Sequence, residues 1–181
     1  MDIKGKRVAI IATDLFEEAE LYEPKQALEE AGAEVAVIAP HDGEIQAVQH
    51  IEKTRKIPVD LTLAQANPDD FDAVLLPGGA MNADALRVER SAQEFVRHLD
   101  TTGKPVAVIC HGPWLLISAR IIKGRRLTSY HTIADDLANA GAEWVDQEVI
   151  TDKNWVSSRK PADIPAFNKA FIALLSSATG E

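Results

Sequence analysis

The chain contains a single cysteine among its 181 residues. One thiol cannot form an internal disulfide, and it excludes the zinc sites that are built from several cysteine ligands. A protein that keeps its thiol reduced is typical of the cytoplasm, where disulfides are rare. We therefore predict a cytoplasmic protein, and the surroundings of Cys110 must show whether its thiol is functional.

Basic residues and long apolar runs are also scarce. Lys and Arg number 19 against 28 Asp and Glu, which gives a formal net charge of −9. Because a nucleic-acid surface needs a basic face, we expect no general binding of nucleic acid. The apolar run at residues 8–12 is too short for a secretory signal or a membrane span, so we expect no membrane partner. No pair of histidines has the spacing of a metal site, and we predict neither a metal nor another cofactor.

The residues that are present indicate one globular domain over residues 1–181, with 46% hydrophobic and 26% charged residues. Short runs of branched residues predict buried strands, at 7–12, 34–39, 72–77 and 103–110. Helical spacing and capping residues predict helices at 17–31, 91–101, 111–119 and 167–175. Later short strands are expected at 126–129, 145–150 and 155–158. The polar segment 41–67 is expected to form a hairpin or an edge excursion.

Strands that alternate with helices predict an α/β fold with a mainly parallel, doubly wound sheet. Ligands of such sheets bind beyond the carboxyl ends of the strands. Three of the first four predicted strands end there in unusual residues, which are Asp14–Glu20, Pro77–Gly79 and Cys110–Pro113. Their convergence predicts a functional site at this edge.

Cys110 stands at the predicted turn from a strand to a helix. Such a nucleophile elbow needs small neighbours, and Gly112 supplies one, although Val108 stands where the hydrolase form of the motif has its first glycine. We expect the following helix to direct its positive end at the thiol and to lower the pKa of Cys110. The alternative is an inert cysteine that ends a strand. The order of strand, Cys, His, Gly, Pro and apolar helix favours the nucleophile.

Acidic residues open the first predicted helix. Glu17, Glu18 and Glu20 can simply complement the helix dipole. Because this helix begins beside the elbow, one carboxyl group can instead face Cys110, as a hydrogen-bonded acid or as a general base. We favour Glu20 over Glu17 for this position.

The remaining candidates surround the same edge. The N–H groups of Gly79 and His111 can form an oxyanion hole. The ring of His111 can act as a base, contact the substrate or leave only its amide at the site, because sequence neighbours rarely face each other on a helix. Asp84 can orient this ring, and His131 is expected at the rim. The other histidines, His41, His50 and His98, are interpreted as surface residues.

At these residues the chain resembles the PfpI family, the intracellular protease I branch of the ThiJ/PfpI superfamily. The matching segments run from the first strand to the last helix: Phe16–Glu20, Leu76–Gly79, Ala107–Pro113, Arg125–Thr128, Asn139–Glu143 and Ser158–Pro161. The Cys-His-Gly-Pro turn together with the double glycine is the most specific of them.

The resemblance implies a flavodoxin-like, three-layer sandwich related to class I glutamine amidotransferases, and a homodimer or higher homo-oligomer. It implies Cys110 as nucleophile with His111 as its partner. The other site residues that it implies are Glu20 with Glu17 as companion acid, the amides of Gly79 and His111, and His131. An acid after the double glycine, often from a neighbouring subunit, maps to Asp84, although the intervening stretch is one residue longer than in some relatives.

Members of this family resemble cysteine peptidases, glutathione-independent glyoxalases, deglycases, chaperones or peroxide sensors. We predict a stress-protective cysteine hydrolase that acts on reactive dicarbonyls and their glycation adducts, or on peptides. The alternative is a peroxide-sensing or chaperone-like protein in which Cys110 is oxidised without turnover. A glutaminase is disfavoured because Thr132 and Ile133 follow His131, so that a His-x-Glu dyad is absent. A binding module without chemistry leaves the convergence of acid, glycines and thiol unexplained.

Overall fold

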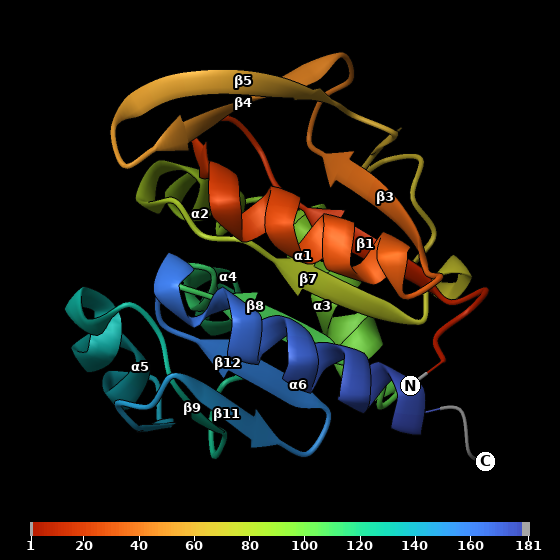
Figure 1. The fold of residues 1–181 in the computed structure, drawn as a ribbon. Helices are drawn as coiled ribbons and strands as arrows, with labels where there is room; N and C mark the ends of the chain where they lie inside the picture. Colours follow the sequence, from red (N-terminus) through yellow and green to blue (C-terminus); the bar gives the residue numbers. More distant parts are fainter. Residues whose placement is uncertain (1, 179–181) are drawn as a thin grey trace.

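A mainly parallel sheet forms the centre of the molecule (Figure 1). The computed structural model describes residues 2–178. The strands of this sheet lie in the order β11-β12-β8-β7-β1-β3-β6, and only β11 runs antiparallel to its neighbour. Their bounds are β1 (Arg7–Ile11), β3 (Glu34–Ala39), β6 (Leu61–Thr62), β7 (Ala73–Leu76), β8 (Val106–Ile109), β11 (Val149–Asp152) and β12 (Trp155–Ser158). The predicted α/β class and sheet type are confirmed.

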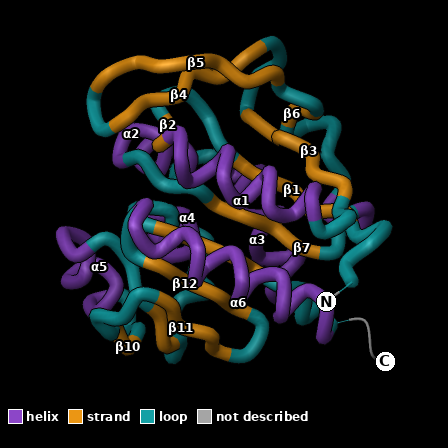
Figure 2. Tube along the Cα trace, in the orientation of Figure 1, coloured by secondary structure: helices purple, strands orange, loops and turns teal. Residues whose placement is uncertain are grey.

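Helices cover both faces of this sheet (Figures 1 and 2). Leu21 and Leu28 of α1 (Glu18–Glu30) pack in one core with Phe167 and Phe171 of α6 (Ile164–Ser177). The opposite core includes apolar residues of α2 (Ala80–Leu86), α3 (Arg90–Thr101), α4 (Pro113–Ser118) and α5 (Ala134–Asn139). Helices, sheet and helices therefore make the three-layer sandwich.

Two smaller sheets and three short turns complete the described chain. β2 (Phe16–Glu17), β4 (Glu44–Gln49) and β5 (Glu52–Pro58) form a three-stranded sheet, in which β4 and β5 are an antiparallel hairpin. The hairpin expected within 41–67 is thus present. β9 (Arg126–Leu127) pairs with β10 (Glu143–Trp144). The 3₁₀ turns are η1 (Pro68–Asp70), η2 (His131–Ile133) and η3 (Pro161–Asp163).

The structure differs from the predicted elements at several places. Residue 17 belongs to β2 rather than to the first helix, and α1 continues through Pro24, which is buried and removes only one backbone donor. The helices α2 and α5 were not predicted. The strand predicted at 145–150 lies at Val149–Asp152, and the last helix begins at Ile164 rather than at 167. Within residues 2–178, no helix is both long and apolar enough to cross a membrane.

Candidate active site

Cys110 occupies a strained turn directly after β8. Its φ is +61°, a left-handed conformation that side chains other than glycine rarely adopt. The turn is held by backbone hydrogen bonds from Cys110 N–H to the Ser158 carbonyl (3.1 Å) and from Gly112 N–H to the Ile109 carbonyl (3.0 Å). A Cβ atom at Gly112 would lie 2.8 Å from the Leu76 carbonyl oxygen, so this position requires glycine. The predicted elbow is therefore present.

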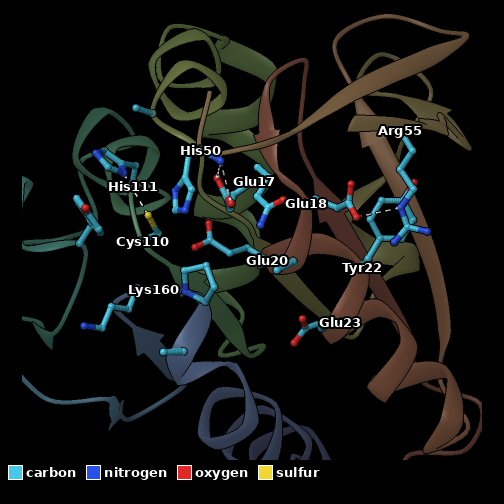
Figure 3. Close-up of a pocket in the computed structure, with 17 residues that line it drawn as sticks. Glu17, Glu18, Glu20, Tyr22, Glu23, His50, Arg55, Cys110, His111 and Lys160 are labelled. Carbon is cyan, nitrogen blue, oxygen red and sulfur yellow. Dashed lines mark hydrogen bonds and ion pairs between the residues drawn. The ribbon is translucent and has the colours of Figure 1, made fainter. Parts of the chain in front are cut away.

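The thiol borders a pocket of about 650 Å³ that several separate segments line (Figure 3). Glu17 and Glu20 come from the start of α1 and the strand before it. His50 and Arg55 come from the hairpin, and Lys160 comes from the loop after β12. Sequence reasoning missed the two hairpin residues, because their distance from Cys110 along the chain hides their place at the pocket.

Glu20 is the acid that the structure brings to the thiol. Its side chain is fully buried, Oε1 accepts the Gly78 N–H at 3.0 Å, and the carboxyl group hydrogen-bonds with Cys110. The other oxygen, Oε2, is buried with no hydrogen-bond partner among the described residues. Burial, and secondly the charge of Glu17, raise the pKa of Glu20 to about 8. Glu20 therefore holds a proton at pH 7.

The environment of the Cys110 thiol corrects our expectation of a lowered pKa. Burial raises the pKa of Cys110, and the negative charge that Glu20 can carry raises it further, while the N–H groups of Gly79 and His111 act in the opposite direction. The thiol is only 7% exposed, and α4 has six residues, which is too short for a strong helix dipole. A protonated Glu20 removes the repulsion and can donate to the sulfur. The acid and the thiol therefore titrate as a pair.

His111 contacts the thiol in spite of being its sequence neighbour. Its Nδ1 lies 3.2 Å from Cys110 Sγ, because the left-handed turn at Cys110 takes the pair out of helical geometry. The ring stacks on Tyr130, with 5.0 Å between centroids, and Nε2 lies 3.5 Å from Thr132 Oγ1. Burial, and secondly the charge of His131, lower the pKa of His111. The neutral ring can therefore accept a proton at neutral pH.

The double glycine is packed too closely for any side chain. A Cβ atom at Gly78 would lie 2.5 Å from Glu20 Oε1 and 2.7 Å from Cys110 Cβ. Gly79 has a φ of +87°, and its Cβ would lie 2.6 Å from the Leu15 carbonyl oxygen. The N–H groups of Gly79 and His111 both hydrogen-bond to the sulfur. These two donors have the arrangement of an oxyanion hole.

The other predicted site residues differ in whether they line the pocket. Glu17 is buried in the pocket wall, where its carboxylate accepts the His50 N–H at 3.1 Å. His131 is exposed in η2 and does not line the pocket, although the centre of its ring lies 4.7 Å from that of Tyr130, which does. Asp84 is exposed on α2 and does not line the pocket, so within one chain it does not orient His111. His50, interpreted as a surface residue, is exposed yet borders the pocket.

Residues 6–174 match the DJ-1/PfpI family, and the chain belongs to this family. It is 44% identical over 169 residues to Deglycase PfpI of Pyrococcus furiosus, covering 93% of this chain and 99% of the relative. It is 40% identical over 171 residues to Putative cysteine protease YraA of Bacillus subtilis, covering 94% and 99%. The crystal structure of Drosophila melanogaster DJ-1beta superposes with a TM-score of 0.86 at 27% identity, covering 98% of this chain and 92% of that one. The predicted family is confirmed.

Proposed function

We propose that this protein is a stress-protective cysteine hydrolase that converts reactive dicarbonyls, and their early adducts on amino groups, into hydroxy acids. The observation that carries the proposal is the Cys110–Glu20 pair, in which a buried acid with a raised pKa hydrogen-bonds the thiol beside two amide donors. Relatives named deglycase and putative cysteine protease support a hydrolytic thiol. A reducing compartment such as the cytoplasm suits a protein whose one cysteine must stay free.

In the first step the Cys110 sulfur adds to the aldehyde carbon of the dicarbonyl. The thiol proton leaves to the neutral His111 ring, whose Nδ1 is 3.2 Å away. The electron pair of the carbonyl moves to its oxygen, which the N–H groups of Gly79 and His111 stabilise before it takes a proton. The product of this step is a hemithioacetal.

Glu20 becomes a carboxylate when it gives its own proton to the carbonyl oxygen at the end of the first step. In the second step this carboxylate is placed to carry a proton from the former aldehyde carbon to the neighbouring carbon, while the hydroxyl proton of the first carbon passes to the oxygen of the second. One carbon is oxidised to a thioester while the next is reduced to an alcohol, so no external oxidant or reductant is needed. Water then cleaves the thioester, which releases the hydroxy acid and restores the thiol. In an adduct on an amine, the sulfur replaces the nitrogen on the same carbon: the carbon–sulfur bond forms, the carbon–nitrogen bond breaks, and the amine leaves with the thiol proton. The resulting hemithioacetal then follows the same second step.

A role for Asp84 in this mechanism requires an oligomer. Asp84 is exposed on α2, the helix that follows the double glycine directly. A second copy of the chain is needed to bring its carboxylate to His111, as the family resemblance implies. We propose a homodimer or higher homo-oligomer for this reason. A strictly monomeric protein in light scattering would remove Asp84 from the mechanism.

The test is lactate formation from methylglyoxal without glutathione. We expect the wild type to turn over and Cys110→Ser to lose all measurable activity, since the alcohol is a far weaker nucleophile than the thiol. Ser157→Ala is the matched control, because Ser157 is a buried residue of β12 that does not line the pocket. Lactate from the wild type and from Ser157→Ala alone supports the proposal. Lactate from Cys110→Ser, or none from the wild type, overturns it, and peptide hydrolysis is then the next assay.

The peroxide-sensor alternative makes a different prediction at the same residue. A thiol that is 7% exposed and has a raised pKa reacts slowly with peroxide, because the thiolate is the reactive form. We therefore expect the mass of the intact protein to stay unchanged in mild peroxide. A rapid gain of two oxygen atoms on Cys110 would favour the sensor.

A further inference from the structure

Asn82 is a fully buried polar residue beside the double glycine. Its Nδ2 donates to the carbonyls of Pro77 (3.2 Å) and Gly78 (2.9 Å), and its Oδ1 accepts the N–H of Thr13 at 2.7 Å. Both donors and the acceptor of the side-chain amide are thus satisfied by backbone groups. Asn82 ties the double-glycine turn to the end of β1, although it does not line the pocket.

The hydrogen bond from Asn82 Nδ2 to the Pro77 carbonyl determines where the N–H of Gly78 points. In a trans peptide the C=O and N–H groups point in opposite directions, and the described backbone has no cis peptide. Because Asn82 holds the Pro77 carbonyl, the N–H of Gly78 points to the opposite side. There it donates to Glu20 Oε1 at 3.0 Å.

The hydrogen bond from Asn82 Nδ2 to the Gly78 carbonyl determines in the same way where the N–H of Gly79 points. Asn82 holds the carbonyl of Gly78, which also accepts the Glu17 N–H at 3.3 Å. The N–H of Gly79 therefore points the other way, where it hydrogen-bonds to the Cys110 sulfur. Glycine offers little resistance to a peptide flip, since its backbone is equally free at positive and negative φ.

We propose that Asn82 is a positioning residue of the active site, which holds two successive peptides so that one N–H faces Glu20 and the next faces Cys110. Its part in turnover rests on the proposed function, while its effect on the thiol does not. A flipped peptide would present a carbonyl oxygen to the sulfur in place of a donor. The oxyanion would then lose one of its two hydrogen bonds.

Asn154 provides a matched control at the other end of the sheet. Its Nδ2 also donates to two acceptors, Asp100 Oδ1 (3.1 Å) and the Lys104 carbonyl (3.0 Å), and its Oδ1 accepts from Arg125 (3.0 Å). It precedes β12, whereas Cys110 follows the carboxyl end of the adjacent β8. Loss of either amide therefore removes three hydrogen bonds, but only Asn82 holds the peptides of the double glycine beside the thiol.

The experiment compares Asn82→Ser and Asn82→Ala with Asn154→Ser and Asn154→Ala, so that no variant adds a charge. Three readouts are needed: the melting temperature, kcat and KM for methylglyoxal, and the pH profile of Cys110 alkylation by iodoacetamide. For the Asn82 variants we expect kcat to fall about 100-fold, which is the usual effect of losing one oxyanion donor. We also expect the alkylation profile to move to higher pH. The Asn154 variants should lower only the melting temperature.

Two results would overturn the proposal: Asn82 variants that melt earlier but keep the wild-type kcat and alkylation profile, or Asn154 variants that shift both equally. If Asn82→Ala does not fold, Asn82→Ser, which keeps one donor, decides the question. If the wild type makes no lactate, the proposed function fails while the alkylation profile still tests Asn82. A profile shift confined to Asn82 variants would then support the positioning role alone.

Discussion

The two ends of strands β8 and β12 hold polar clusters of opposite character, partly buried at the amino end and fully buried around Glu20 at the carboxyl end. At the amino end, Asp100 Oδ1 accepts hydrogen bonds from Arg125 (2.5 Å), Trp155 Nε1 (2.7 Å) and Asn154 Nδ2 (3.1 Å). The Arg125 guanidinium also lies 4.2 Å from the centre of the Trp155 ring. At the carboxyl end, Glu20 has one amide donor at Oε1 and no hydrogen-bond partner at Oε2 among the described residues.

The comparison separates a cluster that stabilises the fold from one that can react. A carboxylate that pairs with a guanidinium and accepts several hydrogen bonds anchors the segments around it. A buried carboxyl with too few donors keeps its proton and can pass it to a neighbour. The same sheet therefore carries a structural acid at one end and a chemical acid at the other.

The largest expected loss of activity comes from a side chain at Gly78, which would fill the space beside Glu20 and Cys110. In Gly78→Ala the new methyl group would meet Glu20 Oε1 at 2.5 Å and Cys110 Cβ at 2.7 Å, so the pair must separate. We expect lactate formation to fall about 10³-fold, comparable to the loss of a catalytic contact. Gly103→Ala is the control, because its φ of +72° strains the backbone while its Cβ meets nothing within 4 Å. Equal losses of activity in both variants would contradict this explanation.

The next effect is a pH dependence of stability that belongs to Glu20. Its pKa of about 8, against an ordinary value of 4.5, means that the folded chain keeps a proton that the unfolded chain releases between these values. The free energy of unfolding should therefore fall as pH rises from 4.5 to 8, by roughly 4 kcal/mol. Glu20→Gln should flatten this slope in urea unfolding measured across that range. An unchanged slope would show that Glu20 is ionised in the folded protein.

The smallest of the three effects is expected at the amino end. Asp100→Asn removes the charge partner of Arg125 while keeping an acceptor, and we expect a loss of about 2 kcal/mol in the free energy of unfolding. The measurement is urea unfolding at pH 7, with kcat for methylglyoxal determined alongside it. Folded Asp100→Asn should retain the wild-type kcat. A drop in kcat would show that the Asp100 cluster affects the Cys110 site and would contradict the separation of the two clusters.

The sequence was sufficient to predict elements with strong local signals. The branched run of β1 and the Cys-His-Gly-Pro elbow can be recognised because strand propensity and turn chemistry are local. The helix α2 was missed because seven residues show too little periodicity. The strand β11 was shifted because Val145, although apolar, instead donates its N–H to the Leu127 carbonyl at the end of β9.

Several residues of the candidate site were predicted correctly, and the wrong or missing predictions have a common cause. Glu20 and Gly79 were found because they lie in the segments that follow β1 and β7, two strands of one sheet whose order a parallel topology restricts. The pKa of Cys110 was predicted in the wrong direction because burial depends on distant segments. Asn82 was missed for the same reason, since an asparagine after a double glycine is an ordinary turn residue until its burial is known.

The hydrogen bond from Cys110 N–H to the Ser158 carbonyl has a consequence for the order of events during synthesis. A ribosome releases β8 long before β12, so the elbow exists for a time without the strand that closes it. During that interval the thiol lacks its neighbouring strand and the pocket wall around Lys160. The nascent chain therefore carries a more exposed cysteine, and the buried environment of Cys110 arises only when β12 docks.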